Sequence, residues 1–531
     1  MTSYDEVPYP SLSHAQCHPN ALATLGILLG LRPAPVEHCR LLEIGCATGS
    51  NLLPMALSLP GATFVGLDYS ARQIEAAQAA ADAVGLNNVT LLYRDIREVT
   101  AELGEFDYIV AHGIYSWVPA DVREQLMVLC GQNLAPHGLA YVSYNTYPGW
   151  HMLGTLRDMM LFHVRGIEDP RERAAEARSL LNFMAESVPT AQRARSALLN
   201  AYSAFLKGEM TRLGPKADAF LLHDELEEVN DPVYFWQFME QAGRHGLQFV
   251  TEVDFRGALP SHYAPKVAET FIHKARNVIE QEQYLDFLRS RSFRQTILCH
   301  AQQAVQRKIT AERLAGCYVA SRAVPEADEP NLNTRTVEKF RALDGTVLSI
   351  DHPASKAALV ILAEQWPQAV PFDTLLDAAR ARLNTAGGEP VAPQPEDQQV
   401  LAVNFLRAFL HSPDLIEVHA APLPFVLAAG PRPEASAWVR WQAAESGQVT
   451  NLRHERVDLD PLNQFLVRRL DGSRGLESLV DLLLAESVAE GKLVVDQDDV
   501  KVTDPAQIRA VVSAELQANL RWLASAALLV A

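Results

Sequence analysis

Residues 41–51 read LLEIGCATGSN, and this stretch decides the fold expected for the first third of the chain. An apolar run that breaks into glycines predicts a buried strand that turns tightly into a helix. Four further apolar runs follow, separated by stretches with helical periodicity, at 62–69, 89–95, 106–113 and 139–145. This alternation predicts an α/β fold with a parallel, doubly wound sheet over residues 1–165.

The composition is that of an ordinary soluble globular protein. The chain has 531 residues, of which 48% are hydrophobic and 21% charged, and this length predicts several domains. The N-terminal MTSYDEVPYP is unlike a signal peptide, and the apolar run at 21–31 is too short to span a bilayer. The six cysteines include no CxxC pair, so we expect a cytoplasmic protein without disulfides or a metal site. The net charge of −18 disfavours a nucleic-acid partner.

The glycine loop is the first candidate binding site, because ligands of such sheets bind beyond the carboxyl ends of the strands. A nicotinamide fingerprint would need glycines at two positions that hold Ala47 and Ser50, and an ATP-type P-loop would need a lysine. Gly45 and Gly49 let the backbone approach a ligand without a Cβ in the way. Amides at the start of the following helix can face a carboxylate.

The spacing of Glu43, Gly45 and Gly49 resembles the first motif of class I S-adenosylmethionine methyltransferases, which have a Rossmann-like fold. The resemblance implies S-adenosyl-L-methionine as cofactor and S-adenosyl-L-homocysteine as product. Glu43 would face the methionine amine, and Asp68 would accept the ribose hydroxyls. Adenine would lie against Tyr69, with its edge at Asp95 and Ile96. The other residues expected at the cofactor are Cys46 (as a small packing residue), Ala47, Asn51, Ser70, His112 and Gly113, with Tyr9 and His14 in an N-terminal lid.

The resemblance extends over nearly the whole chain. The start VPYPSLSHAQCHP, the loop SYNTYPGW (143–150), HDELEEVNDPVYFWQF (223–238) and EQYLDFLRSRSFRQTILCH (282–300) are similar to bacterial methyltransferases that carry a methyltransferase regulatory domain. Residues 439–472 are similar to the C-terminal domain of bacterial protein-lysine methyltransferases that modify outer-membrane proteins. The combination implies methylation of lysines on a protein partner.

Four domains are expected: a methyltransferase domain with its lid at 1–165, a mainly helical regulatory domain at 166–315, and two winged-helix-like α+β units at 316–430 and 431–531. Residues 358–383 and 465–487 each read as helix, turn, helix, and each is followed by a third helix with a strand-like tail. The second helix of each unit is mixed or acidic in charge. This favours protein recognition or scaffolding over DNA binding.

Methyl transfer from a sulfonium is an in-line displacement, so a lysine nucleophile must be neutral and closely positioned. The loop 143–150 offers an amide and aromatic rings that can hold an amine and desolvate it. We expect catalytic roles for Asn145, Tyr115 and Tyr144, and a lysine channel lined by Trp117, Tyr147 and Trp150. Two alternatives stay open: methylation of a small-molecule amine or hydroxyl, and a regulatory protein that binds the cofactor without catalysis.

Overall fold

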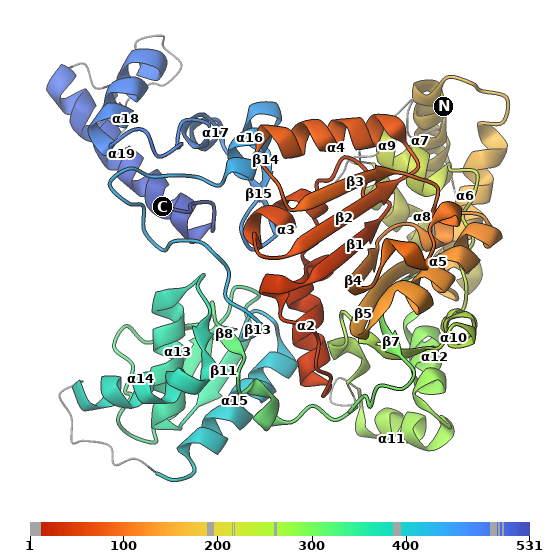
Figure 1. The fold of residues 1–531 in the computed structure, drawn as a ribbon, viewed down its shortest axis with the longest axis horizontal. Helices are drawn as coiled ribbons and strands as arrows, with labels where there is room; N and C mark the ends of the chain where they lie inside the picture. The colour runs from red at the N-terminus through yellow and green to blue at the C-terminus, as the bar shows by residue number, and fades with distance from the viewer. Residues whose placement is uncertain are drawn as a thin grey trace.

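A seven-stranded sheet forms the centre of the molecule (Figure 1). The computed structural model describes residues 12–187, 196–214, 216, 218–259, 263–385, 394–488, 496–497, 500–501 and 504–531. The strand order is β3-β2-β1-β4-β5-β7-β6. The strands are β1 Arg40–Ile44, β2 Thr63–Asp68, β3 Val89–Tyr93, β4 Phe106–Ala111, β5 Leu134–Asn145, β6 Leu247–Glu252 and β7 Phe293–His300.

The first five strands are parallel and follow the predicted α/β pattern. Helices connect them, namely α3 Leu52–Ser58, α4 Ala71–Ala83 and α5 Ala120–Asn133. Side chains alternate along β5, so that Tyr141 packs in the apolar cluster on one face of the sheet and Val142 and Tyr144 pack in the cluster on the other. Burial on both faces explains why β1, β2, β4 and β5 read as continuous apolar runs, whereas the edge strand β3 is only partly buried.

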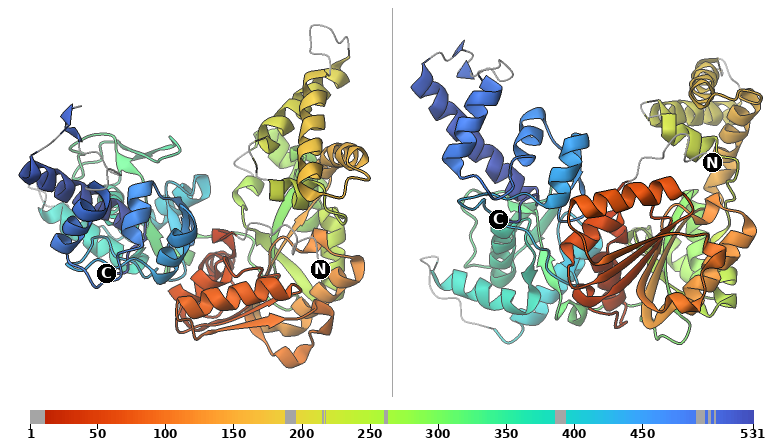
Figure 2. Two further views of the ribbon diagram at one scale, coloured as in Figure 1. Left: turned by 90° about the horizontal axis from the view of Figure 1, so that it is seen from above. Right: turned by 45° about the horizontal axis from the view of Figure 1, so that its top comes forward.

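The last two strands come from the segment expected to be mainly helical. Strand β7 pairs antiparallel with β5, and β6 pairs antiparallel with β7. The predicted boundary at 165/166 therefore cuts through this sheet, since strands far apart along the chain share one hydrogen-bonded ladder. The helices of this segment are α6 Gly149–His163, α7 Pro170–Ser187, α8 Ala197–Leu213, α9 Asp218–Phe220, α10 Phe235–Arg244, α11 Pro265–Lys274 and α12 Val278–Arg289. Helices α7 and α8 project from the sheet on the side opposite the C-terminal units (Figure 2).

The two C-terminal units repeat the predicted order of three helices and a strand-like tail. The first contains β8 Tyr318–Ala320, β9 Val324–Pro325, β10 Glu338–Arg341, β11 Val347–Ile350, α13 Pro353–Gln365, β12 Val370–Pro371, α14 Phe372–Thr385, α15 Asp397–His411 and β13 Glu417–His419. The second contains α16 Ala437–Glu445, β14 Gln448–Thr450, β15 Arg456–Asp458, α17 Pro461–Val467, α18 Leu476–Leu483 and α19 Pro505–Ser525, with a bridge from Leu529 to Ala435.

Both C-terminal units pack on the sheet domain. Helix α2 (Pro19–Leu28) joins the first unit, where Asn20 Nδ2 donates to Ala421 O at 2.8 Å. Trp438 in α16 packs against Leu53 of α3 and Ala80 of α4, which joins the second unit to the glycine-loop side of the sheet. The end of the chain is thereby brought to the site predicted near its start.

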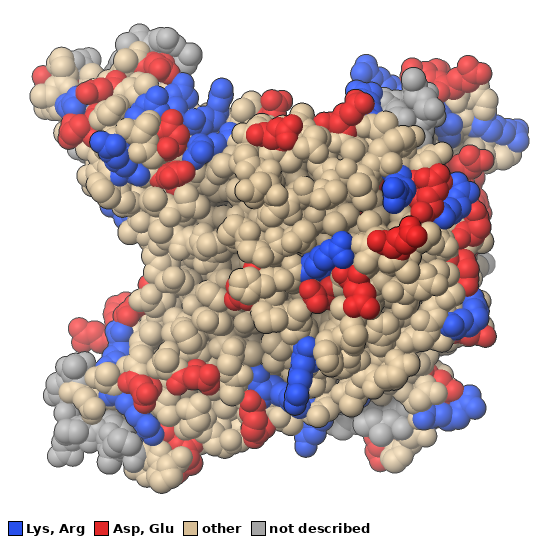
Figure 3. Space-filling model, viewed as in Figure 1, with Lys and Arg blue, Asp and Glu red and all other residues tan. Residues whose placement is uncertain are grey.

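On the face shown in Figure 3, basic and acidic side chains alternate around the periphery and the centre is mostly uncharged. The expectation that the protein has no nucleic-acid partner stays a prediction based on its net charge. Within the described residues, no helix combines the length and apolar character needed to cross a membrane.

Candidate functional site

The glycine loop after β1 has the backbone that its sequence predicts. Gly45 and Gly49 have φ values of +70° and +78°, where a side chain would be strained. A Cβ at Gly45 would also lie 2.2 Å from Ile114 Cδ1. Asp68, at the end of β2, fixes the loop because its Oδ2 accepts from Ala47 N at 3.0 Å and its Oδ1 accepts from Ser70 N at 2.9 Å.

The residues expected around adenine lie beyond β2 and β3. Tyr69 is 59% exposed and its ring centroid lies 6.4 Å from that of Tyr93. Ile96 is buried, while the Arg97 guanidinium hydrogen-bonds to Asp95 and lowers the pKa of that carboxyl. Their roles at adenine stay predictions.

Glu43 is the most informative side chain of the loop. It is 4% exposed, and its Oε1 accepts from Asn51 Nδ2 at 2.6 Å. Its Oε2 is buried and has no hydrogen-bond partner among the described residues. Burial raises the pKa of Glu43 to about 8, although the hydrogen bond from Asn51 opposes this shift. A buried carboxylate oxygen without a partner is costly in a folded protein, so this free acceptor fits a ligand that carries a cationic amine.

Asn51 connects the glycine loop to the N-terminal segment and to the C-terminal unit. Its Oδ1 lies 2.9 Å from the backbone nitrogen of His14 and 2.9 Å from Nε2 of His454. The His14 ring packs on the His112 ring with centroids 3.8 Å apart. The structure therefore brings together Asn51, His14 and His112, three residues of the predicted cofactor set, and adds His454. Their contact with the cofactor stays a prediction. Tyr9, the other residue of the predicted lid, lies outside the described residues.

Burial makes these imidazoles weak bases. It lowers the pKa of His14 to about 4, with a smaller contribution from Arg456, and it lowers the pKa of His112 to about 3, with a smaller contribution from His14. The pKa of His454 is also well below its ordinary value, because the ring is buried and neighbours His18 and His14. All three rings are neutral at pH 7.

Asn145, at the end of β5, is held by polar contacts. Its backbone N–H donates to Ser116 Oγ at 2.9 Å, and its Nδ2 donates to Asn230 Oδ1 at 2.9 Å. At the end of β4, Gly113 N donates to Ser143 Oγ at 2.8 Å, and the space where its Cβ would lie is open. Asn230 was missed from the sequence, because it lies 85 residues from Asn145 and no local pattern connects the two residues.

The expected catalytic roles of Tyr115 and Tyr144 need correction, because both side chains are buried in the core. Tyr144 is 1% exposed and its ring stacks on Phe238 with centroids 4.0 Å apart. Tyr115 is buried beside it and donates from its hydroxyl to Gln241 Oε1 at 2.5 Å. Trp150 is also buried. Tyr144 and Asn145 are successive residues of one strand and so face opposite sides of the sheet. The face of Tyr144 is covered by Phe238 and Tyr115, which places its ring in the core.

Other aromatic side chains remain accessible near Asn145. We call Tyr147, His151, Tyr234 and Phe287 the aromatic cluster: the Tyr147 ring stacks on His151 with centroids 4.1 Å apart and lies 5.3 Å from Tyr234, which lies 5.8 Å from Phe287.

Two further aromatic residues lie after β4 and across from the end of β5. Trp117 is half-buried. Phe293 is paired with Asn145 across the β5–β7 ladder, is 42% exposed, and lies 6.3 Å from the His112 ring. Phe293 was missed because residues 282–300 indicated the family but contained no local pattern of a binding site.

Cys46 is a packing residue, as expected. It is buried, and a Cβ at the neighbouring Gly66 would lie 2.8 Å from its Sγ. Burial raises its pKa well above the ordinary value. A helix start therefore does not activate this thiol.

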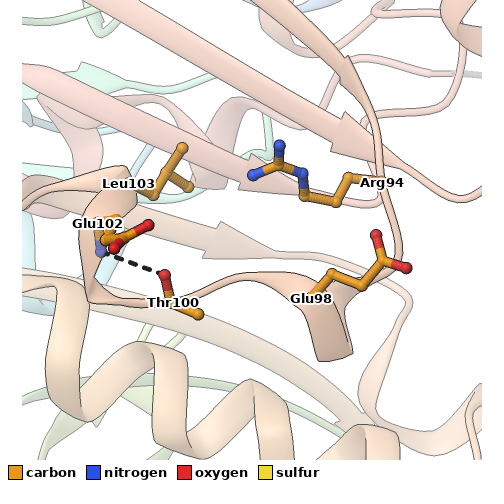
Figure 4. Close-up of a pocket in the computed structure, with 5 residues that line it drawn as sticks. All are labelled: Arg94, Glu98, Thr100, Glu102 and Leu103. Atoms are coloured by element: carbon orange, nitrogen blue, oxygen red, sulfur yellow. Dashed lines mark hydrogen bonds between the residues drawn. The ribbon is translucent and has the colours of Figure 1, made fainter.

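A surface depression of about 480 Å³ lies beside the predicted adenine end, but none of the predicted residues lines it. Figure 4 shows Arg94 and Glu98 on one side of it and Leu103, Glu102 and Thr100 on the other. Its walls are polar and carry both charges. No group of three or more metal-ligating side chains occurs in the described ranges.

Three family models match separate segments of the chain. A methyltransferase domain matches residues 42–140, a predicted methyltransferase regulatory domain matches 217–300, and the C-terminal winged helix domain of PKMT matches 431–528. The first model begins in β1 and ends in β5, and the second ends with β7, so together they reach every strand of the central sheet.

Relatives in Rickettsia match over the full length. The uncharacterized protein RP789 of Rickettsia prowazekii (strain Madrid E) is 33% identical over 534 residues, which cover 99% of this chain and 93% of that protein. The structure of PKMT2 from Rickettsia typhi in complex with AdoHcy is similar with a TM-score of 0.86 and 27% identity, over 99% of this chain and 100% of that one.

The agreement of domain order, fold and full-length similarity confirms the family resemblance and the cofactor that it implies. The chain belongs to the PKMT family of S-adenosylmethionine-dependent methyltransferases, in which a class I methyltransferase domain is joined to a regulatory domain and a C-terminal winged helix domain.

Proposed function

We propose that the protein transfers methyl groups to lysine side chains of a protein substrate. The cofactor supplies a methyl group on a sulfonium, and the chain must supply a binding surface that delivers a neutral amine. The resemblance of residues 439–472 to bacterial protein-lysine methyltransferases, together with the match to the PKMT winged helix domain, supports a protein substrate. The partner is a protein with accessible lysines.

The observation that carries this proposal is the kind of side chain that surrounds Asn145 at the end of β5. Its exposed side chains are aromatic, and the imidazoles of His14 and His112 have pKa values of about 4 and 3. Methylation of a hydroxyl needs a base that works near neutral pH, and the two imidazoles next to the cofactor loop, His14 and His112, are too weakly basic for that task. An amine needs no such base once it has lost its proton.

Lysine can reach the neutral state without a catalytic base. A free lysine has a pKa of ~10.4, so neutralising it at pH 7 costs roughly 4–5 kcal/mol. A nearby sulfonium and a desolvating aromatic surface both lower that cost. The aromatic cluster and Phe293 supply such a surface, and their ring faces also favour a methylated ammonium product. Asn145 can position the amine through its amide oxygen.

The test is labelling of a cell-envelope protein fraction with methyl-labelled cofactor, followed by mass mapping. We expect label on lysine side chains. The same fraction with its lysines acetylated beforehand is the matched substrate control and should take up no label. Label only on low-mass compounds, or on acetylated protein at the same level, would contradict the proposal.

The enzyme control is Glu43→Gln, which should lose labelling through loss of cofactor. An Asn145→Ala variant that binds the cofactor normally but labels poorly would support the positioning role of the amide. Loss of cofactor affinity in Asn145→Ala would instead indicate collapse of the cofactor site.

A further inference from the structure

A hairpin of the winged helix domain inserts against the cofactor loop. Strands β14 and β15 form the hairpin, and the turn between them is closed by Asn451 N donating to Glu455 O at 2.9 Å and His454 N donating to Asn451 O at 2.9 Å. His454 at this turn is 3% exposed and has φ +63°. A left-handed conformation favours glycine, and among residues with a side chain it is adopted most often by asparagine, aspartate and histidine, so the turn places an imidazole where glycine would be less strained.

The imidazole contacts one side chain of the glycine loop. His454 Nε2 lies 2.9 Å from Asn51 Oδ1, which also accepts from His14 N. Since Asn51 Nδ2 donates to Glu43 Oε1, its oxygen must face the two donors, and His454 carries its proton on Nε2. The neutral state of the ring agrees with its lowered pKa. Asn51 thus accepts a hydrogen bond from the winged helix domain through Oδ1 and donates one to Glu43 through Nδ2.

The hairpin is held in place by contacts outside the site. Thr450 Oγ1 lies 3.1 Å from Ser13 Oγ, and Trp438 and Trp441 pack against the helices next to the glycine loop. Arg453, next to His454, reaches Glu417 and lies over the Trp366 ring. Movement of the winged helix domain would therefore move His454 relative to Asn51.

We propose that the winged helix domain completes the cofactor site: His454 is a positioning residue that fixes Asn51, and Asn51 fixes Glu43 to receive the amine of the cofactor. By linkage, cofactor binding stabilises the docked position of this domain, and docking strengthens cofactor binding by the same factor. The proposal rests on cofactor binding and not on the lysine assignment. It survives if the methylated substrate proves to be something else.

The first test compares two ligands on the full chain by calorimetry. S-adenosylhomocysteine carries the amine that Glu43 would receive, whereas methylthioadenosine has the same nucleoside and thioether without the amino-acid part. In His454→Gly the backbone strain is relieved and the donor is lost, so S-adenosylhomocysteine should bind about tenfold more weakly. Binding of methylthioadenosine should be unchanged. Equal weakening of both ligands, or of neither, would overturn the proposal.

The matched control is Ala527→Gly, which replaces another buried left-handed residue of the same domain, with φ +56°, and should bind both ligands normally. Because His454 acts through Asn51, the double variant Asn51→Ala/His454→Gly should bind S-adenosylhomocysteine no more weakly than Asn51→Ala alone. His454→Gln, which keeps a donor, should restore part of the affinity lost in His454→Gly.

A second test uses the unaltered protein. Hydrogen exchange of the amides in 451–455 should slow when S-adenosylhomocysteine is added, because binding stabilises the docked hairpin. Unchanged exchange at saturating ligand would contradict the proposed coupling. This measurement decides the question even if His454→Gly fails to fold.

Discussion

The carboxyl edge of the sheet has two halves of different chemistry. At the ends of β1 and β2, the polar half consists of Glu43, Asn51 and Asp68, joined by hydrogen bonds to the glycine loop and to the winged helix domain. At the end of β5 and the start of β7, the aromatic half consists of the aromatic cluster and Phe293, which are partly exposed. The first half is suited to a fixed charged ligand, and the second to the stem of a variable partner.

The two halves also differ in how they are supported. Asn51, in the polar half, is fixed by contacts from both ends of the chain. The aromatic half rests on a buried ion network, in which Arg294, fully buried, hydrogen-bonds to Glu252 at 2.8 Å and to Asp286 at 2.8 Å. The comparison indicates that hydrogen bonds fix the side chains of the polar half, while the aromatic half, which is the proposed substrate side, is an exposed surface above a buried ion network.

The largest expected effect concerns the buried ion network around Arg294. Arg294→Met should destabilise the fold by about 3–5 kcal/mol, because it leaves buried carboxylates without their counter-charge. Thermal or denaturant unfolding measures the loss. Arg276→Met is the control, since Arg276 is an exposed residue paired with Glu280, and its melting temperature should barely change. A stable Arg294→Met would show that the aromatic half does not depend on the network.

The next effect concerns the polar half. Glu43→Gln should weaken S-adenosylmethionine binding by on the order of 100-fold, because the amine loses a buried counter-charge. Calorimetry measures the affinity. Glu98→Gln, at an exposed acid after β3, should bind the cofactor as the parent does. Unchanged affinity in Glu43→Gln would remove the assignment of the polar half to the amine.

A smaller effect is expected where the two halves meet. Asn145→Ala should lower turnover about tenfold, by removing one hydrogen bond to the nucleophile, and should leave the cofactor affinity within twofold. Single-turnover kinetics separates the two quantities. Asn133→Ala removes hydrogen bonds from the amide to Thr100 O and Gly104 O in a distant turn, and it should change neither quantity.

The smallest effect is expected for the exposed ring of Phe293. Phe293→Ala should raise the KM for a protein substrate a few-fold, consistent with about 1 kcal/mol for an exposed aromatic–cation contact, without changing cofactor affinity. Phe293→Trp should retain the parent KM. A loss of cofactor affinity in Phe293→Ala would place this ring with the polar half and break the comparison.

Sequence reasoning was most successful where the chemistry is local. The glycines, Glu43 and Asp68 follow from the strand–turn–helix pattern, because neighbouring residues in the chain determine where they lie. The whole-chain resemblance correctly indicated the family and the winged helix domain.

The remaining residues depend on long-range packing. His454 is 403 residues from Asn51, and no local pattern marks a buried histidine at a hairpin turn as part of a site. Phe293 lies beside Asn145 only because β7 pairs with β5. The error on Tyr144 was avoidable, since strand alternation predicts that Tyr144 and Asn145 cannot both face one channel.

The burial of Glu43 has a consequence for the pH dependence of the free enzyme. Its pKa of about 8 means that the carboxyl is mostly protonated at pH 7. An arriving ammonium group favours the ionised form, so loading of the enzyme should expel close to one proton per cofactor near neutral pH. The heat of loading should then change with the ionisation enthalpy of the buffer, and affinity should rise as the pH approaches 8. Each catalytic cycle would begin with the release of a proton to solvent, before the methyl group is transferred.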